Sequence, residues 1–252
     1  MDHGRSARVG QLPWHVSVGV RRNRGPILTA YEGHQGGGTI IARQWVLTAA
    51  HCLAPLSDLL TDGAYTAGRS DVRLCIARGP DLRAPLREVD VTFALVHPRF
   101  ELRTLACDVA LLRLAEDMDG AVAMAEGDLT AGECGVVAGW GVTHGSSRLM
   151  PSLAWARMHV AHDAAGDDHD GGDGFDRATM FIAGGDAAAC PGFGSARIRK
   201  GDSGGGFVVT RAGMPQLAGI VSWSARGADG MDGCVLTRTA PLASWIAGAA
   251  TI

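Results

Sequence analysis

Short apolar runs separated by glycine and proline restrict the fold of this chain more than any other feature of its sequence. The runs are long enough for strands but too short for helices. The 36 glycines and the 6% aromatic content add to a profile of many tight turns. Many short strands joined by turns predict an all-β protein built as a barrel or a sandwich. The expected strands are residues 15–20, 39–42, 45–48, 89–96, 109–114, 135–138, 206–209 and 217–221.

One helix is predicted, at residues 240–249 near the end of the chain. Pro241 falls in its first turn, and Leu242, Trp245 and Ile246 recur at i, i+3 and i+4. We expect this apolar stripe to pack against the last sheet. A chain of 252 residues with 46% apolar residues is large enough to bury the core of a single domain.

The composition argues against two kinds of partner. A net charge of −3 provides no basic field that would concentrate nucleic acid. The longest apolar stretches, such as residues 89–96 and 217–223, are far shorter than the roughly 18 residues needed to cross a bilayer. We therefore expect no nucleic acid and no membrane as partner. The first residues also lack the basic start and apolar core of a secretory signal.

An acidic segment, DAAGDDHDGGDGFD at residues 163–176, has no apolar periodicity and predicts an exposed loop. The carboxylates of residues 167–176 are ligands of the kind that calcium prefers. Their spacing does not match the EF-hand pattern, so a solvated acidic loop is the favoured interpretation.

The sequence GDSGG at residues 201–205 has the features of a nucleophilic serine. The glycines around Ser203 allow a substrate carbonyl to approach, and backbone N–H groups can converge there to form an oxyanion hole. The pattern G-x-S-x-G also matches the nucleophile elbow of α/β-hydrolases, in which the acid and the histidine follow the serine. The last histidine of this chain is His169, which precedes Ser203, so that alternative fails.

The base must therefore lie upstream of the serine. His51, in TAAHC at residues 48–52, directly follows an apolar strand and small neighbours. Asp108 heads the apolar run DVALLRL, where a buried carboxylate needs a partner such as an imidazole N–H. The order His51, Asp108, Ser203 is that of the chymotrypsin group, whereas a subtilisin-like order would place the aspartate first.

TAAHC, DVALLRL and GDSGG resemble the three signature blocks of trypsin-like serine peptidases. Further blocks follow in family order: QLPWHVSV at 11–18, GGGTIIARQWVLTAAHC at 36–52, VHPRF at 96–100, GWG at 139–141, GIVSW at 219–223 and SWI at 244–246. The resemblance implies a single peptidase domain over residues 1–252, with two six-stranded antiparallel β-barrels and the active site between them. The barrels would span residues 15–115 and 130–238, followed by the C-terminal α-helix at 240–249.

The resemblance also implies a serine endopeptidase that hydrolyses peptide bonds through an acyl-enzyme intermediate, with no metal or cofactor. His51 would accept the Ser203 proton, Asp108 would orient His51, and the N–H groups of Gly201 and Ser203 would bind the oxyanion. The segment Ser222, Trp223 and Ser224 would pair with the substrate backbone as an edge strand. A protein or peptide substrate, a monomer and a secreted or periplasmic location are expected on the same basis.

The start of the chain departs from the family pattern. Active members usually insert a free amine, made by cleavage before Ile-Val-Gly-Gly, which pairs with the aspartate before the nucleophile. That aspartate would be Asp202, and family spacing puts Met1 at the inserting position with only Gly4 of the four retained. Either Met1 stands where the natural protein has another residue, or Met1 itself inserts. Without an inserted amine, Asp202 would be an unpaired buried charge and the oxyanion hole would not form.

The cysteines also depart from the family pattern. Cys52 normally pairs with a position occupied here by Gly36, and Cys134 with one occupied here by Val209. The family register places Cys190 and Cys234 beside the specificity pocket, so the resemblance implies a disulfide between them, with free thiols as the alternative.

The specificity pocket can be aligned in two ways. Counting back from Ser203 puts Arg197 at its base, which suits an acidic substrate side chain. Aligning Cys190 instead puts Ala188 and Ala189 there, which suits an apolar one. Neither alignment supplies a carboxylate, so cleavage after lysine or arginine is not expected. The third possibility is that Arg197, Arg199 and Lys200 form an exposed loop.

Two other functions compete with the active peptidase. A non-catalytic or zymogen-like homologue that acts as a binding or regulatory module is supported by the unusual start and the lost disulfide partners, but all three triad residues argue against it. A serine esterase or acyltransferase of another fold is the other candidate, and the order of the residues argues against that one.

Overall fold

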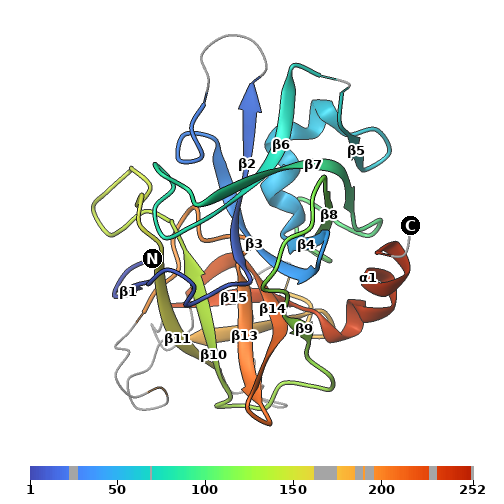
Figure 1. Cartoon of the computed structure of the whole chain (residues 1–252). Helices are drawn as coiled ribbons and strands as arrows, with labels where there is room; N and C mark the ends of the chain where they lie inside the picture. The colour runs from blue at the N-terminus through green and yellow to red at the C-terminus, as the bar shows by residue number, and fades with distance from the viewer. Residues whose placement is uncertain are drawn as a thin grey trace.

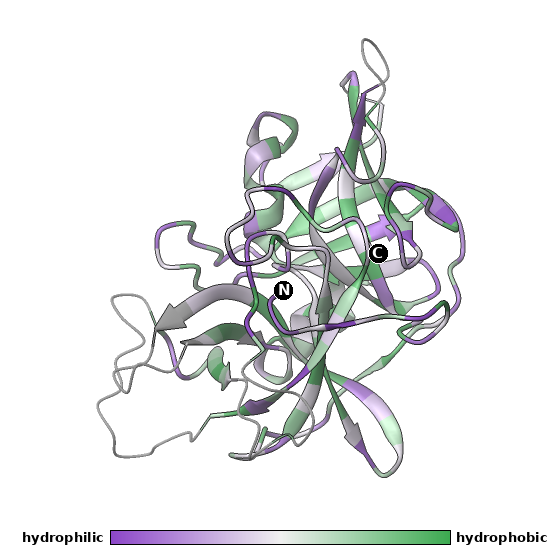
Figure 2. Ribbon diagram, turned by 90° about the vertical axis from the view of Figure 1, so that its left-hand side faces the viewer, coloured by the Kyte–Doolittle hydropathy of each residue, from purple (hydrophilic) through white to green (hydrophobic). Residues whose placement is uncertain are grey.

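Two closed six-stranded antiparallel β-barrels make up most of the structure, which confirms the predicted fold class (Figure 1). The computed structural model describes residues 1–22, 28–68, 70–161, 175–184, 190, 196–226 and 232–250. Figure 2 shows that hydrophobic residues concentrate along the strands, whereas hydrophilic residues are more frequent in the connecting loops. Within these ranges, no helix has the length and apolar character required to cross a bilayer.

The first barrel closes where two of its strands, β7 and β8, pair with each other. Alternate residues of its first strand, Val16, Val18 and Val20, are buried in its core, as the two-residue period of a strand requires. Its strands are β2 (His15–Arg22), β3 (His34–Ala42), β4 (Trp45–Thr48), β6 (Val72–Arg78), β7 (Arg87–Val96) and β8 (Ala110–Leu114), with β5 (Ala64–Thr66) added beside β7.

The second barrel closes where β11 pairs with β12. Phe181 and Phe207 fill its core, with ring centroids 5.4 Å apart in an edge-to-face arrangement. Its strands are β10 (Cys134–Gly139), β11 (Ala154–Val160), β12 (Met180–Gly184), β13 (Gly206–Arg211), β14 (Met214–Arg226) and β15 (Asp232–Arg238), with β1 (Arg5–Ser6) and β9 (Ala123–Met124) at its periphery.

The C-terminal helix is present where it was predicted, as a 3-10 turn η2 (Ala240–Leu242) that continues into α1 (Ala243–Ala249). Leu242 and Ile246 pack in a core cluster that contains strand residues of both barrels, so the helix does not contact the last sheet alone. Trp245 stacks edge-to-face on the buried His97 of the first barrel, at 4.6 Å between ring centroids. The helix therefore helps to hold the two barrels together.

The predicted Cys190–Cys234 disulfide is wrong. The disulfide joins Cys134 to Cys190, and Cys234 is a free, buried thiol. Cys234 lies opposite Ala183 in the β12–β15 pairing, and its Sγ is 3.9 Å from the Met158 Sδ inside the second barrel. Its side chain therefore faces the core of the second barrel and packs there as a small apolar group.

Candidate active site

The turn that carries Ser203 requires glycine on both sides. Gly201 and Gly204 have φ of +96° and +82°, a region that L side chains rarely adopt. A Cβ at Gly204 would also collide with the Gly37 carbonyl oxygen and the Thr48 hydroxyl of the first barrel. This close approach lets the Gly37 N–H donate to the Ser203 carbonyl oxygen at 2.6 Å. The turn therefore holds Ser203 of the second barrel against β3 of the first.

His51 and Asp108 meet at the edge of the first barrel. His51 lies at the start of a 3-10 helix, η1 (Ala50–Leu59), directly after β4, while Asp108 precedes β8, and β4 pairs with β8. The Asp108 Oδ2 accepts a hydrogen bond from the His51 Nδ1 at 2.7 Å, and its Oδ1 accepts one from the His51 backbone N–H at 2.8 Å. The Asp108 side chain is fully buried, whereas that of His51 is 23% exposed.

The electrostatics of this pair favour the charged ring. Burial of the imidazole is the largest single influence and disfavours its protonated form, but the hydrogen bonds and charges of Asp108 and Cys52 together outweigh burial and hold the pKa of His51 above its usual 6.5. The neighbouring Cys52 acts on the His51 pKa in the same direction as Asp108. His51 is therefore a stronger base than a free imidazole.

Ser222 is hydrogen-bonded to both Asp108 and Ser203. Its hydroxyl donates to the Asp108 Oδ2, and its carbonyl oxygen accepts from the Ser203 Oγ at 3.4 Å. The sequence placed Ser222 only in the substrate-pairing strand and missed its contact with the carboxylate. No local signal could have revealed this contact, because the two residues are 114 positions apart in the chain.

The Ser203 hydroxyl and the His51 Nε2 are not hydrogen-bonded to each other in the described part of the chain. Ser203 donates to the Ser222 carbonyl oxygen instead, and the His51 Nε2 is hydrogen-bonded to the Cys52 Sγ at 3.8 Å. A rotation of the Ser203 hydroxyl towards His51 is needed before a proton can move, which is common where no substrate is bound.

Two N–H groups at the serine turn are available to a ligand. Among the described hydrogen bonds, neither the Gly201 N–H nor the Ser203 N–H has an acceptor. The Gly201 carbonyl oxygen, by contrast, accepts from the His34 Nε2 at 2.9 Å, and the His34 Nδ1 accepts from the Ser17 hydroxyl at 2.6 Å. Burial lowers the pKa of His34, which keeps this ring neutral. His34, which the sequence reasoning missed, thus fixes the orientation of Gly201.

The structure brings Met1 and Asp202 together. The α-ammonium of Met1 lies 3.1 Å from the Asp202 Oδ2, and the two side chains are 1% and 0% exposed. The ammonium also donates to the carbonyl oxygens of Gly141 and Val142, at 3.2 and 2.9 Å. The N–H groups of Gly141 and Arg199 donate to the Asp202 carboxylate at 2.9 and 2.8 Å. The buried pair is therefore well hydrogen-bonded, as such pairs must be.

The segment before the serine anchors the start of the chain. Arg197 exchanges two backbone hydrogen bonds with Asp2, at 2.9 and 3.2 Å, and the Arg199 guanidinium binds the Asp2 carboxylate at 2.6 Å. Of the three basic residues expected in an exposed loop, Lys200 is exposed, whereas Arg197 and Arg199 are partly buried. The alternative pocket residues Ala188 and Ala189 lie outside the described residues, as do residues 167–174 of the acidic segment, so the pocket and the calcium site stay predictions.

The segment Ser222, Trp223 and Ser224 has one open edge. Strand β14 pairs with β13 only up to Ile220, while its pairing with β15 continues to Arg226. Within the described residues, no strand covers the β13 side of Ser222–Ser224. An extended peptide can therefore pair with this edge.

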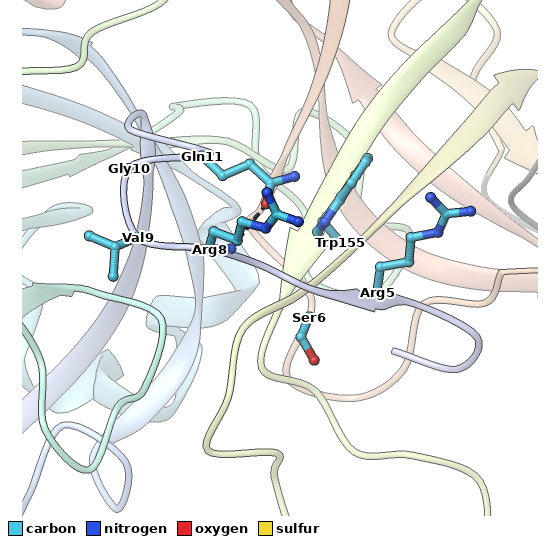
Figure 3. A pocket seen from close by; sticks show the side chains of 7 residues that line it. All are labelled: Arg5, Ser6, Arg8, Val9, Gly10, Gln11 and Trp155. Atoms are coloured by element: carbon cyan, nitrogen blue, oxygen red, sulfur yellow. Dashed lines mark hydrogen bonds between the residues drawn. The ribbon is translucent and has the colours of Figure 1, made fainter.

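A pocket of about 440 Å³ lies away from this site, between the start of the chain and β11 (Figure 3). None of the predicted site residues lines it. Its lining consists of Arg5, Ser6, Arg8, Val9, Gly10, Gln11 and Trp155.

Comparison with known proteins identifies the family. The sequence model of the family described as trypsin matches residues 1–246. The chain belongs to the trypsin family. Two proteins of Drosophila melanogaster resemble this trypsin-family chain: serine proteinase stubble, 28% identical over 96% of the chain, and trypsin iota, 29% identical over 98% of it. The chain spans 30% of the length of stubble and 87% of the length of trypsin iota.

Proposed function

We propose that this trypsin-family chain is a serine endopeptidase that hydrolyses peptide bonds with Ser203, His51 and Asp108. The single observation that carries the proposal is the pair of hydrogen bonds from His51 to the buried Asp108 carboxylate, beside a serine whose turn presents two unengaged N–H groups. The family supports a hydrolase that acts on protein substrates.

In the proposed mechanism, the substrate backbone pairs with the open edge of Ser222–Ser224. The Ser203 hydroxyl rotates towards the His51 Nε2, gives up its proton and attacks the peptide carbonyl carbon. The new oxyanion accepts hydrogen bonds from the N–H groups of Gly201 and Ser203. His51 then donates the proton to the leaving amine. In the second half of the reaction, His51 accepts a proton from a water that attacks the acyl carbon, and then donates this proton to the Ser203 Oγ, which releases the acid and restores Ser203.

Asp108 has two tasks in this mechanism. It keeps the proton of the neutral imidazole on Nδ1, so that Nε2 faces the serine, and it stabilises the imidazolium that forms during attack. The Ser222 hydroxyl occupies a lone pair of the same carboxylate and so restricts its rotation. We further propose that the protein is a monomer. A secreted or periplasmic location is proposed because disulfides such as Cys134–Cys190 persist in oxidising compartments.

A zymogen-like or non-catalytic homologue is the second candidate. The observation that favours it is the Ser203 hydroxyl, which bonds to the Ser222 carbonyl and not to His51. Such a protein would keep the fold and the Asp108–His51 pair without turning over substrate.

Intact-mass analysis after treatment with a fluorophosphonate separates the two candidates. This reagent traps a serine only when the serine is activated and lies beside a formed oxyanion hole. We expect one adduct that maps to Ser203, that is absent in Ser203→Ala and that persists in the control Ser57→Ala, which changes an exposed serine of η1. Turnover of a peptide substrate should fall by about 10⁶-fold in Ser203→Ala. No adduct on the unmodified chain would favour the non-catalytic homologue.

A further inference from the structure

The thiol of Cys52 faces the nitrogen of His51 that the proposed mechanism uses. The Cys52 Sγ lies 3.8 Å from the His51 Nε2, while the His51 Nδ1 is occupied by Asp108. Cys52 is a free cysteine, 3% exposed. Gly36 lies opposite it, and a Cβ built there would be 2.5 Å from the sulfur, so a glycine leaves the thiol without a disulfide partner. Nothing in the proposed mechanism uses this thiol.

The separation of the two atoms matches the geometry of a bound metal ion. Zinc binds imidazole nitrogen at about 2.0 Å and thiolate sulfur at about 2.3 Å, which in a tetrahedral site puts nitrogen and sulfur about 3.5 Å apart. The observed 3.8 Å is within a few tenths of an ångström of that value. Imidazole together with thiolate is also a ligand pair that favours Zn²⁺ over Mg²⁺ or Ca²⁺.

The contact of His51 with Asp108 also fits the role of a metal-binding histidine. A histidine that binds a metal usually donates its other ring N–H to a carboxylate, which fixes the ring and increases the basicity of the metal-binding nitrogen. Asp108 makes this contact with the His51 Nδ1 at 2.7 Å. His51 and Cys52 are neighbours at the start of η1, so both ligands are held by one short element.

We propose that the His51 Nε2 and the Cys52 Sγ form an inhibitory site for a thiophilic divalent cation such as Zn²⁺. One hydrogen bond joins the two atoms in the free protein, and the cation displaces the proton that they share and releases it to solvent. The structure describes no group of three or more metal-ligating side chains, so water completes the coordination and binding is reversible. The 23% exposure of the His51 side chain provides the entry path.

Inhibition follows because the cation takes the nitrogen lone pair that would accept the Ser203 proton. This consequence rests on the proposed function, whereas cation binding itself does not. The two can therefore be tested separately.

Binding is tested on the Ser203→Ala chain, which keeps both ligands and cannot turn over. Cd²⁺ alone is titrated in, and the ultraviolet absorption of the cadmium–thiolate bond is recorded. We expect one equivalent of this signal, which is lost when Cys52→Ala or the isosteric Cys52→Ser is added. The signal should persist with Cys75→Ala, which removes another buried free thiol of the first barrel. A Cd²⁺ signal unchanged by both Cys52 variants would overturn the proposal, as would an affinity unchanged by His51→Ala.

Inhibition is tested on the chain with Ser203 intact. We expect Zn²⁺ to slow fluorophosphonate labelling at least about tenfold, EDTA to restore it, and Cys52→Ala to be labelled at the same rate with and without Zn²⁺. Zn²⁺-sensitive labelling of Cys52→Ala would refute the assignment. A chain that is not labelled even without Zn²⁺ would refute the proposed peptidase function, while the Cd²⁺ titration would still report on the site.

Discussion

Moving the Met1 amine away from Asp202 is expected to disable the serine turn. One extra residue before Met1 displaces the amine by about 3.5 Å and leaves the Asp202 carboxylate facing a neutral amide. That carboxylate is fully buried, and removing one partner of a buried pair costs about 3–5 kcal/mol. At 1.4 kcal/mol per factor of ten, this cost corresponds to a loss of about 10²- to 10³-fold or more in the population with an intact turn.

The effect reaches the active site because Asp202 lies between Gly201 and Ser203, whose N–H groups would bind the oxyanion. The second-order rate of fluorophosphonate labelling measures the intact population. Labelling of the extended chain within threefold of the original rate would refute the reasoning. Burial of the Met1 amine can be measured directly by acetylation in Lys200→Arg, because Lys200 is the only lysine of the sequence and this variant leaves the α-amine as the only primary amine. In that variant, the buried α-amine of the folded chain should react slowly with an acetylating reagent.

A double-variant cycle separates the ion pair from a general loss of fold. Asp202→Asn leaves the Met1 ammonium buried without its carboxylate, and should by itself slow labelling by a similar factor. Because both changes remove the same interaction, the extended Asp202→Asn chain should lose much less than the product of the two single effects. Strictly multiplicative losses would show that the two groups act independently.

Three further predictions concern histidines. kcat/KM for a small peptide should rise with pH as His51 loses its proton, with a midpoint above pH 6.5. The midpoint should move down in Cys52→Ala, because Asp108 and Cys52 both raise the His51 pKa. A midpoint below pH 6.5 in the unmodified chain would contradict this prediction. His34→Ala should cost about 1–3 kcal/mol in kcat/KM, seen in kcat more than in KM, because Gly201 loses its hydrogen bond; an unchanged kcat would refute this role. Burial lowers the pKa of His15 to about 3, so only the unfolded chain gains the His15 proton as the pH falls from 6.5 to 5. Urea unfolding should therefore show about 2 kcal/mol less stability at pH 5 than at pH 7 because of this residue. An equal loss of stability in His15→Phe would rule out this contribution of His15.

The sequence by itself determined the features that are written in neighbouring residues. Strand periodicity and turn glycines gave the all-β architecture, and the i, i+3, i+4 repeat gave the terminal helix, because both depend on local geometry. Four barrel strands were missed: Arg73 interrupts the apolar run of β6 and Arg157 that of β11, while the apolar runs of β12 and β15 are only four and three residues long. The order of His51, Asp108 and Ser203 was enough to select them as candidates and to exclude an α/β-hydrolase arrangement.

Only the tertiary structure decided the contacts between residues far apart in the chain. Ser222 on Asp108 and His34 on Gly201 span 114 and 167 positions, and no local pattern encodes such pairings. The disulfide was mispredicted for the same reason: which thiols meet depends on which way each strand faces, and Cys234 faces the barrel interior. The contact between Cys52 and the His51 Nε2 joins neighbours in sequence, yet it too depended on the fold, because the glycine at position 36 leaves the thiol unpaired beside the ring.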